Sequence, residues 1–271
     1  MLGSPDQGVL TLAELYFHYT SGNAFTDIVR SKSFWLTNGR FLNDPMDCND
    51  RNDELESLAN VHLSGDLKDV FLSMTKHTVD AYVASFGRSG DSLLHWRAYG
   101  DDGAGVALGY DPDLLTGTVK SEQGYRVDPK TMLGTQPVTY SRVKLNNFLE
   151  LAFESTASKM SKGGNINSLA VQLFLTAKTF LCGYKHESWA GEEEARLLHL
   201  ALPNAIPALQ RGFRVNRGNL YDYAVAPYPI EALKTVSLGP KCLFEVSMVD
   251  RYLTSLGYTD FSVKKSDLLY R

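Results

Sequence analysis

Three charged residues near position 194 have types and a spacing that suit chemistry on a sugar. In WAGEEEARLLHLAL, residues 189–202, Glu192, Glu194 and Arg196 are each two positions apart. Residues two apart share one face of a strand, so we expect these side chains to point the same way. The arginine would keep a carboxylate ionised, and an ionised carboxylate beside a sugar stabilises an oxocarbenium-like transition state or polarises a hydroxyl nucleophile. The alternative is a surface ion pair at the start of a strand.

A histidine near the start of the chain is the second candidate. The segment LYFHYT, residues 15–20, alternates in the period of a strand and places His18 on one face with Tyr16 and Thr20. A histidine with a neighbouring hydroxyl, here that of Thr20, can hydrogen-bond a ribose or a phosphate. A purely structural histidine is the alternative.

Further candidates lie in a loop and on a strand. Asn43, Asp44 and Pro45 form an expected turn, because proline fixes its own φ and restricts the residue before it. Asn43 and Asp44 either orient a ligand or cap the local backbone. Ser85 is a candidate ligand contact, but no nucleophile-elbow pattern surrounds it, so a serine hydrolase is not expected.

Two aromatic residues are candidates for stacking on a flat ring. Trp96 and Tyr99 are three apart in an expected short helix, hence on one face, where they can stack on a nicotinamide or a base. Ordinary core packing is the alternative. The following segment GDDGAG, residues 100–105, lacks the spacing of a phosphate-binding glycine loop.

The stretch 81–111 is expected to position these groups. Two apolar strands, 81–86 and 106–110, flank the aromatic helix and together build a pocket wall. Further strands are expected at 33–37, 69–74, 136–140, 235–238 and 261–264, with a hairpin or edge strand at 211–223. Helices are expected at 24–31, capped by Ser21, and at 142–162, 168–184 and 246–256.

Composition narrows the class of protein. The chain has 271 residues, 44% hydrophobic and 21% charged, as in ordinary globular proteins. A net charge of -4 argues against a nucleic-acid coat protein but allows a local basic patch. Three widely spaced cysteines predict neither a disulfide framework nor a metal site and favour the cytoplasm. No apolar run approaches the roughly 20 residues that span a bilayer, and residues 1–13 read as a loose leader without signal-peptide features.

The segments in order resemble the bacterial DUF2971 family, which is poorly characterised. The resemblance rests on LYFHYT, SFWLT, FLNDP, SFGRSGDSLLHWRAYGDDGAGVALGYD, WAGEEEARLL and VSLGPKC, from about residue 15 to 242. Phe17 between the tyrosine and His18, and Gly87 where a small polar residue is more usual, depart from the family pattern. We expect one α+β domain over residues 14–271, with a helical insertion at about 142–184.

The layout also resembles the ADP-ribosyltransferase fold, in which a split, mostly antiparallel sheet flanked by helices grips NAD. The resemblance implies a role for each matching position: His18 with Thr20 on a ribose, Trp96 or Tyr99 on nicotinamide, Glu194 driving transfer and Glu192 engaging the acceptor. On this view Arg196 fixes the Glu194 carboxylate.

The leading expectation is therefore an NAD-dependent, ADP-ribosyltransferase-like enzyme acting as a toxin, phage-defence factor or effector. NAD would be the substrate, and the acceptor an unknown protein or nucleic acid. The alternative is a non-enzymatic module that binds a nucleotide or nucleic acid, in which RGFRVNR, residues 211–217, contacts phosphates and Phe213 stacks on a base. A third possibility is a scaffold whose aromatic pocket is all core.

Overall fold

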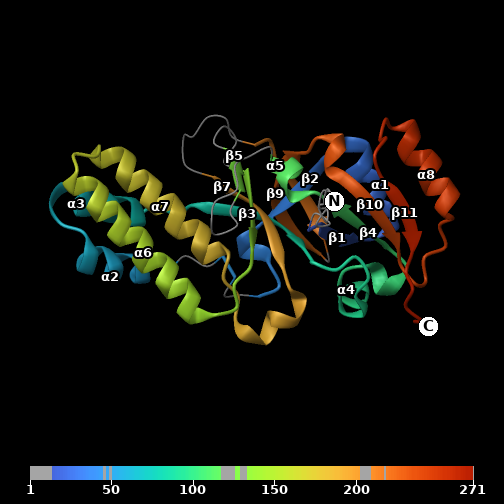
Figure 1. Ribbon diagram of the computed structural model, residues 1–271, viewed down its shortest axis with the longest axis horizontal. Coiled ribbons are helices and arrows are strands. Elements are labelled where there is room, and N and C mark those ends of the chain that lie inside the picture. Colours follow the sequence, from blue (N-terminus) through green and yellow to red (C-terminus); the bar gives the residue numbers. More distant parts are fainter. Residues whose placement is uncertain are drawn as a thin grey trace, which may run out of the picture.

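The chain folds into two mostly antiparallel sheets flanked by helices, as Figure 1 shows. The computed structural model describes residues 14–44, 47–48, 51–116, 126–128, 133–201, 209–216 and 218–270. The predicted leader at 1–13 lies outside the described residues. The structure thus agrees with the expected α+β class. In the described part of the chain, no helix is both long and apolar enough to cross a membrane.

The first sheet has four strands in the order β1-β4-β10-β11. Their bounds are Tyr16–Thr20, Val106–Tyr110, Leu233–Leu238 and Ser262–Lys265. β4 pairs antiparallel with both β1 and β10, and β11 joins parallel to β10. Helices α1 (Gly22–Ser31) and α8 (Val246–Ser255) bury Phe25 and Leu253 in the core of this sheet. Ser21 caps α1 as predicted, its hydroxyl accepting from the Ala24 N–H at 3.3 Å.

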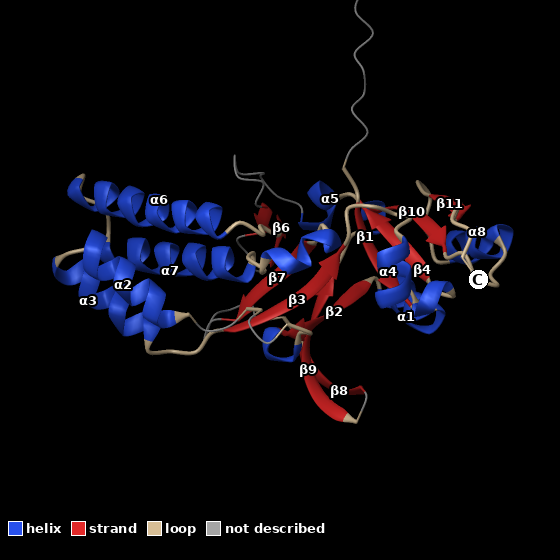
Figure 2. Ribbon diagram, turned by 90° about the horizontal axis from the view of Figure 1, so that it is seen from below, coloured by secondary structure: helices blue, strands red, loops and turns tan. Residues whose placement is uncertain are grey.

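The second sheet has seven antiparallel strands in the order β5-β6-β7-β3-β2-β9-β8. Their bounds, in that order, are Arg126–Asp128, Leu133–Pro137, Ala195–Ala201, Asp80–Phe86, Ser33–Asn38, Asn219–Pro227 and Arg211–Asn216. The predicted hairpin is confirmed as β8 and β9, and Figure 2 shows it projecting from the sheet.

The two sheets meet where β1 runs beside β3. The Phe17 N–H donates to the Gly87 carbonyl, and the Gly87 N–H donates to the Phe17 carbonyl, both at 2.8 Å. Only this isolated bridge joins the two strands in the described residues. The sheets therefore diverge on either side of it, and a cleft opens between them.

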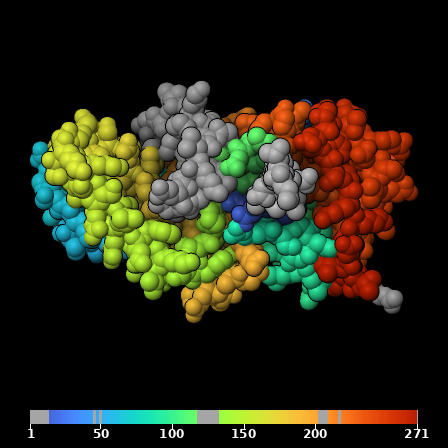
Figure 3. All heavy atoms as spheres, in the orientation of Figure 1, coloured from blue at the N-terminus to red at the C-terminus, as the bar shows by residue number. Residues whose placement is uncertain are grey.

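Four helices form a separate apolar cluster at one end of the molecule (Figures 1 and 3). They are α2 (Asn52–His62), α3 (Gly65–Thr75), α6 (Arg142–Ser161) and α7 (Ile166–Cys182). The last two confirm the predicted helical pair. The strand predicted at 69–74 is wrong, because the segment is the middle of α3. Its buried positions Leu67, Phe71 and Thr75 are four apart, which is the spacing of a helix.

Short helices connect the remaining elements. α4 (Leu93–Ala98) and α5 (Pro112–Thr116) flank β4, and 3₁₀ turns lie at η1 (Gly39–Phe41), η2 (Asp101–Gly103), η3 (Glu187–Glu192) and η4 (Ile230–Ala232). The continuous strand expected over residues 189–202 is wrong in its first part. η3 ends at Glu192 and Glu193 takes the left-handed conformation with φ 42°, so β7 begins only at Ala195.

Candidate active site

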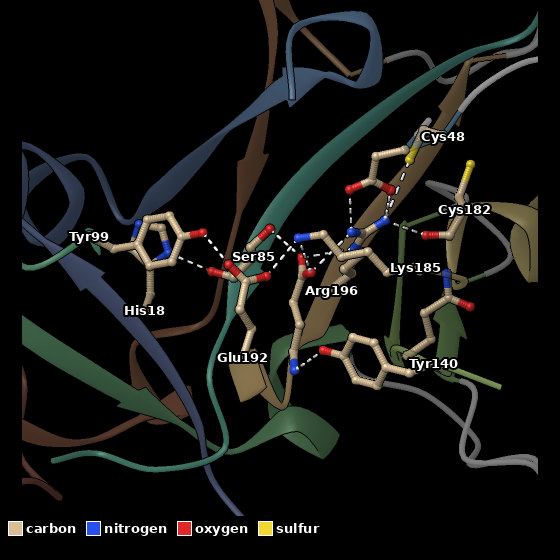
Figure 4. A network of polar contacts seen from close by, with 12 residues as sticks. His18, Cys48, Ser85, Tyr99, Tyr140, Cys182, Lys185, Glu192 and Arg196 are labelled. Atoms are coloured by element: carbon tan, nitrogen blue, oxygen red, sulfur yellow. Dashed lines mark hydrogen bonds and ion pairs between the residues drawn. The ribbon is translucent and has the colours of Figure 1, made fainter. Parts of the chain in front are cut away.

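A cleft of about 930 Å³ lies between the two sheets, a size that suits a small-molecule ligand. β1 supplies His18 and Thr20, and β3 supplies Ser85. Glu192 and Glu194, which close η3 and precede β7, lie on the same cleft. Figure 4 shows how the side chains of His18, Ser85 and Glu192 gather with those of Lys185 and Arg196. The topology thus brings together residues that are far apart along the chain.

Glu194 is the most tightly held side chain of the cleft. Its side chain is 5% exposed, and its Oε1 accepts from the Ser85 hydroxyl at 2.6 Å and from Arg196 Nε at 2.8 Å. Its Oε2 accepts from Arg196 Nη2 at 3.0 Å and from Lys185 Nζ at 3.3 Å. The backbone N–H of Glu194 donates to the Tyr140 hydroxyl at 2.8 Å. The carboxylate is therefore fixed in place at the wall of the cleft.

Arg196, which holds the Glu194 carboxylate, has no exposed surface. Its two terminal nitrogens each donate to one oxygen of Asp47 at 2.5 Å, a bidentate pair. Nη1 also donates to the Cys182 carbonyl at 2.6 Å and lies 3.7 Å from Cys48 Sγ. Arg196 therefore ties β7 to the loop that carries Asp47 and to the end of α7.

Lys185 links Glu194 to the second carboxylate. Its Nζ lies 2.6 Å from Glu192 Oε2, and the other oxygen of Glu192 accepts from the Tyr99 hydroxyl at 2.5 Å. The Lys185 ammonium also lies 4.5 Å from the centre of the Trp189 ring, a cation–π contact. Glu192 is 9% exposed and lies at the cleft wall. The three carboxylates of Asp47, Glu192 and Glu194 thus meet only two cations, so the cluster carries one net negative charge.

The surroundings keep Glu194 ionised. Burial alone raises the pKa of this carboxyl, but the Arg196 guanidinium, the Lys185 ammonium and the Ser85 hydroxyl outweigh burial and lower the pKa to about 2. The same carboxylate raises the pKa of Lys185 against the opposing effect of burial. At neutral pH the cleft therefore presents a permanent negative charge at Glu194.

A pH titration of stability tests this charge. The pKa of Glu194 lies at about 2 against an ordinary 4.5, so its contribution is complete above pH 4.5 and is lost as the pH falls toward 2. We expect this loss to be about 3 kcal/mol. Between pH 2 and 6, the free energy of unfolding, measured with denaturant, should depend less on pH for Glu194→Gln than for Glu193→Gln. Glu193→Gln is the matched control, because it makes the same change at an exposed neighbour. Parallel curves for the two variants would contradict the assignment.

His18 is placed as a neutral hydrogen-bonding group. Its Nδ1 lies 3.0 Å from the Ser85 carbonyl, and because a carbonyl only accepts, Nδ1 carries the proton. Burial lowers the pKa of His18, and the charge of Arg214 acts in the same direction. The ring packs against Phe34 and Phe86, with both centroid separations 5.5 Å. Nε2 is therefore an acceptor suited to a hydroxyl of a ligand.

The other predicted contacts are divided between the cleft and the core. Thr20 and Asn43 line the cleft, whereas Asp44 is buried and its carbonyl accepts from the Asp47 N–H at 2.9 Å. Pro45, in the same predicted turn, lies outside the described residues. Asp44 thus supports the loop that carries Asp47.

Trp96 and Tyr99 do not share a helix face, contrary to the prediction. α4 ends at Ala98, and Tyr99 follows it with non-helical φ −132°. Trp96 has no exposed surface, and its Nε1 donates to Asp91 at 2.7 Å. Tyr99 is 38% exposed and lines the cleft. Of the two rings, Tyr99 is the one that a ligand in the cleft can reach.

Two functional candidates, Asp47 and Lys185, were not singled out by the sequence reasoning. Lys185 lies seven residues before Glu192, and that short spacing was the available signal. Asp47 meets Arg196 across 149 residues, and no local pattern predicts such a pair. In the described part of the chain, no group of His, Cys, Asp or Glu side chains is arranged to hold a metal ion.

One family model matches part of the chain. Neither a curated protein nor a solved structure matches the chain. Residues 95–197 match the model of a family described as "Protein of unknown function (DUF2971)". This segment contains Tyr99, Lys185, Glu192, Glu194 and Arg196, which is the charged cluster without Asp47. His18 and the hairpin also lie outside the matched range. This match supports the predicted family resemblance over residues 95–197, where the chain is similar to the DUF2971 family.

Proposed function

We propose that this protein is an ADP-ribosyltransferase-like enzyme that uses NAD as its substrate. The observation that carries the proposal is the Glu194 carboxylate, held ionised by Arg196, Lys185 and Ser85 on a cleft that His18 also lines. Two sheets that diverge on either side of a single bridge support an ADP-ribosyltransferase-like arrangement. Three free cysteine thiols favour the cytoplasm as its compartment.

Three properties of the cleft suit NAD. Its volume of about 930 Å³ falls within the range of cofactor pockets. The net negative charge of the cluster suits the positively charged nicotinamide ring. His18 supplies an acceptor for a ribose hydroxyl through Nε2, because its Nδ1 carries the proton that bonds the Ser85 carbonyl. The residues present therefore fit NAD.

When NAD is bound, it supplies a glycosidic bond whose electron pair leaves with nicotinamide. With the ribose carbon beside Glu194, the fixed charge of this carboxylate would stabilise the carbon as it becomes electron-poor, without reorganisation. Arg196 and Ser85 hold the carboxylate in position. Because these two residues prevent the carboxylate from rotating, it stays correctly oriented throughout the reaction.

Glu192 is assigned to the acceptor. It lies beside Glu194 through their shared partner Lys185 and accepts from Tyr99. The acceptor nucleophile forms a bond to the ribose carbon as nicotinamide leaves, and the proton that it loses passes to Glu192 and then to solvent. Tyr99, partly exposed at the cleft, is placed to contact the departing ring or the acceptor.

The first test is whether the purified protein releases nicotinamide from NAD. Water can replace the acceptor, so slow hydrolysis is expected even when the acceptor is missing, and chromatography measures the nicotinamide formed. A rate above that of the same solution without protein supports the proposal. A protein that binds NAD and releases no nicotinamide, with water or with protein and nucleic-acid extracts added as acceptors, would contradict it.

The second candidate function is a non-enzymatic nucleotide-binding module. One observation favours it: each oxygen of Glu194 already accepts two hydrogen bonds, so the carboxylate is fully engaged in structural contacts. On this alternative, Glu194 supports the cleft without taking part in chemistry. It predicts nucleotide binding without bond cleavage.

A further inference from the structure

The part of the cleft formed by β2, η1 and the β8–β9 hairpin has chemistry of its own. Trp35, Thr37, Phe41, Arg214 and Tyr221 line it. In the paired register, Thr37 lies opposite Tyr223 and Arg214 lies opposite Tyr221. Paired residues share a face of the sheet, so these side chains form one surface turned toward the cleft.

Within the described residues, the Arg214 guanidinium has no anionic partner. Its Nη2 donates to Thr37 Oγ1 at 2.6 Å, and its Nε is buried with no hydrogen-bond partner in the described part of the chain. The carboxylate nearest to it along the hairpin, Asp222, accepts instead from Tyr82 at 2.7 Å and Asn38 at 3.1 Å. Burial lowers the pKa of Arg214, as expected where no carboxylate compensates the charge. A ligand anion would satisfy both the charge and the orphaned N–H.

Half-exposed aromatic rings surround this cation. The Trp35 indole is 46% exposed and stacks on Tyr223, with centroids 4.3 Å apart and an interplanar angle of 15°. Phe41 is 40% exposed and packs against Tyr221, with ring centroids 4.9 Å apart. A rigid aromatic ring with one open face in a cleft is suited to stacking on a base.

This surface and Glu194 lie on the same cleft. Arg214 and His18 both line the cleft, His18 Nδ1 donates to the Ser85 carbonyl, and the Ser85 hydroxyl donates to Glu194. The cation, the ribose acceptor and the carboxylate therefore follow one another along a single cleft. That order matches phosphate, ribose and reacting carbon in a dinucleotide.

We propose that Arg214 and Trp35 form a subsite for a nucleoside diphosphate, with the guanidinium on the diphosphate and the indole on the base. The planar fork of arginine matches phosphate oxygens in a bidentate manner. The proposal rests on the proposed function in one respect only, which is that the ribose following the diphosphate lies at Glu194.

This assignment differs from the one based on the sequence RGFRVNR. Phe213 is 72% exposed and alternates with Arg214 along β8, so it lies on the opposite face of the hairpin. One nucleotide cannot contact Arg214 in the cleft and stack on Phe213. Arg217, also in that segment, lies outside the described residues.

Titration calorimetry with ADP tests the subsite, because ADP contains the base and diphosphate but no nicotinamide bond. We expect Arg214→Gln and Trp35→Ala each to weaken ADP binding by about tenfold to a hundredfold. Arg214→Lys should restore part of the loss, since it keeps the charge but not the fork. Arg211→Gln and Phe213→Ala, matched changes on the other face of the same strand, should leave binding within about twofold of wild type. Thermal melting confirms that each variant is folded.

The outcomes separate this inference from the proposed function. If ADP binding depends on Arg214 and Trp35 but NAD is never cleaved, the subsite stands and the transferase assignment falls. If NAD is cleaved but ADP binds equally well to Arg214→Gln and Arg211→Gln, the subsite is overturned alone. Failure of the wild-type protein to bind ADP at millimolar concentration would also overturn it.

Discussion

Glu194→Gln should slow nicotinamide release from NAD by about a hundredfold to a thousandfold, the range found when one preorganised electrostatic group is removed from a transition state. The substitution keeps the size and shape of the side chain but removes the charge that Arg196 and Lys185 hold in place. The charge on the ribose carbon develops only as the bond breaks. The dissociation constant for NAD should therefore change by less than about tenfold.

Glu193→Gln provides the matched control for this experiment. Glu193 is exposed and lies between Glu192 and Glu194, so the same chemical change is made one residue away. It should leave the rate within about twofold of wild type. A Glu194→Gln protein that releases nicotinamide at the wild-type rate would show that the carboxylate is structural.

Arg196→Met should have the largest effect on stability of any single substitution in the cluster. Arg196 has no exposed surface and neutralises both Asp47 and Glu194, so its removal leaves two buried carboxylates with fewer partners. Breaking a buried ion pair from one side costs about 3–5 kcal/mol. Equilibrium denaturant unfolding at neutral pH measures the loss.

Arg97→Met is the control, because Arg97 is an exposed arginine on α4. It should change the free energy of unfolding by no more than about 0.5 kcal/mol. Lowering the pH should partly rescue Arg196→Met relative to wild type, since protonation removes the uncompensated charge on the carboxylates. A stability loss below about 1 kcal/mol for Arg196→Met would mean that the cluster is not held by this residue.

Much of the fold could be predicted because it is encoded locally. LYFHYT alternates in the period of β1, Ser21 supplies the cap of α1, and the apolar spacing of residues 142–184 gives α6 and α7. The strand predicted at 69–74 failed because a short apolar run fits either a strand or a buried helix. Only packing against α7 and α6, through Phe71, decides in favour of the helix.

The candidate site was predicted from residue types but not from their partners. The spacing of Glu192, Glu194 and Arg196 pointed to residues that the fold does bring together, although the expected shared strand face does not exist. Glu193 has a left-handed backbone conformation, which turns the chain between Glu192 and Glu194. Lys185, just before η3, and Asp47, in a loop distant in sequence, complete the cluster. Trp96 and Tyr99 lie on different sides of the end of α4. The helix ends there because the backbone of a single residue, Tyr99, is no longer helical. Such features depend on tertiary contacts, and a local sequence pattern does not contain them.

A crystal structure of the protein with a non-cleavable NAD analogue tests the central claim most directly. We expect the analogue in the cleft between the sheets, with its nicotinamide ribose between His18 and Glu194, its diphosphate at Arg214 and its base on Trp35. An analogue bound outside this cleft, or bound within it with the nicotinamide ribose out of contact with Glu194, would contradict the account.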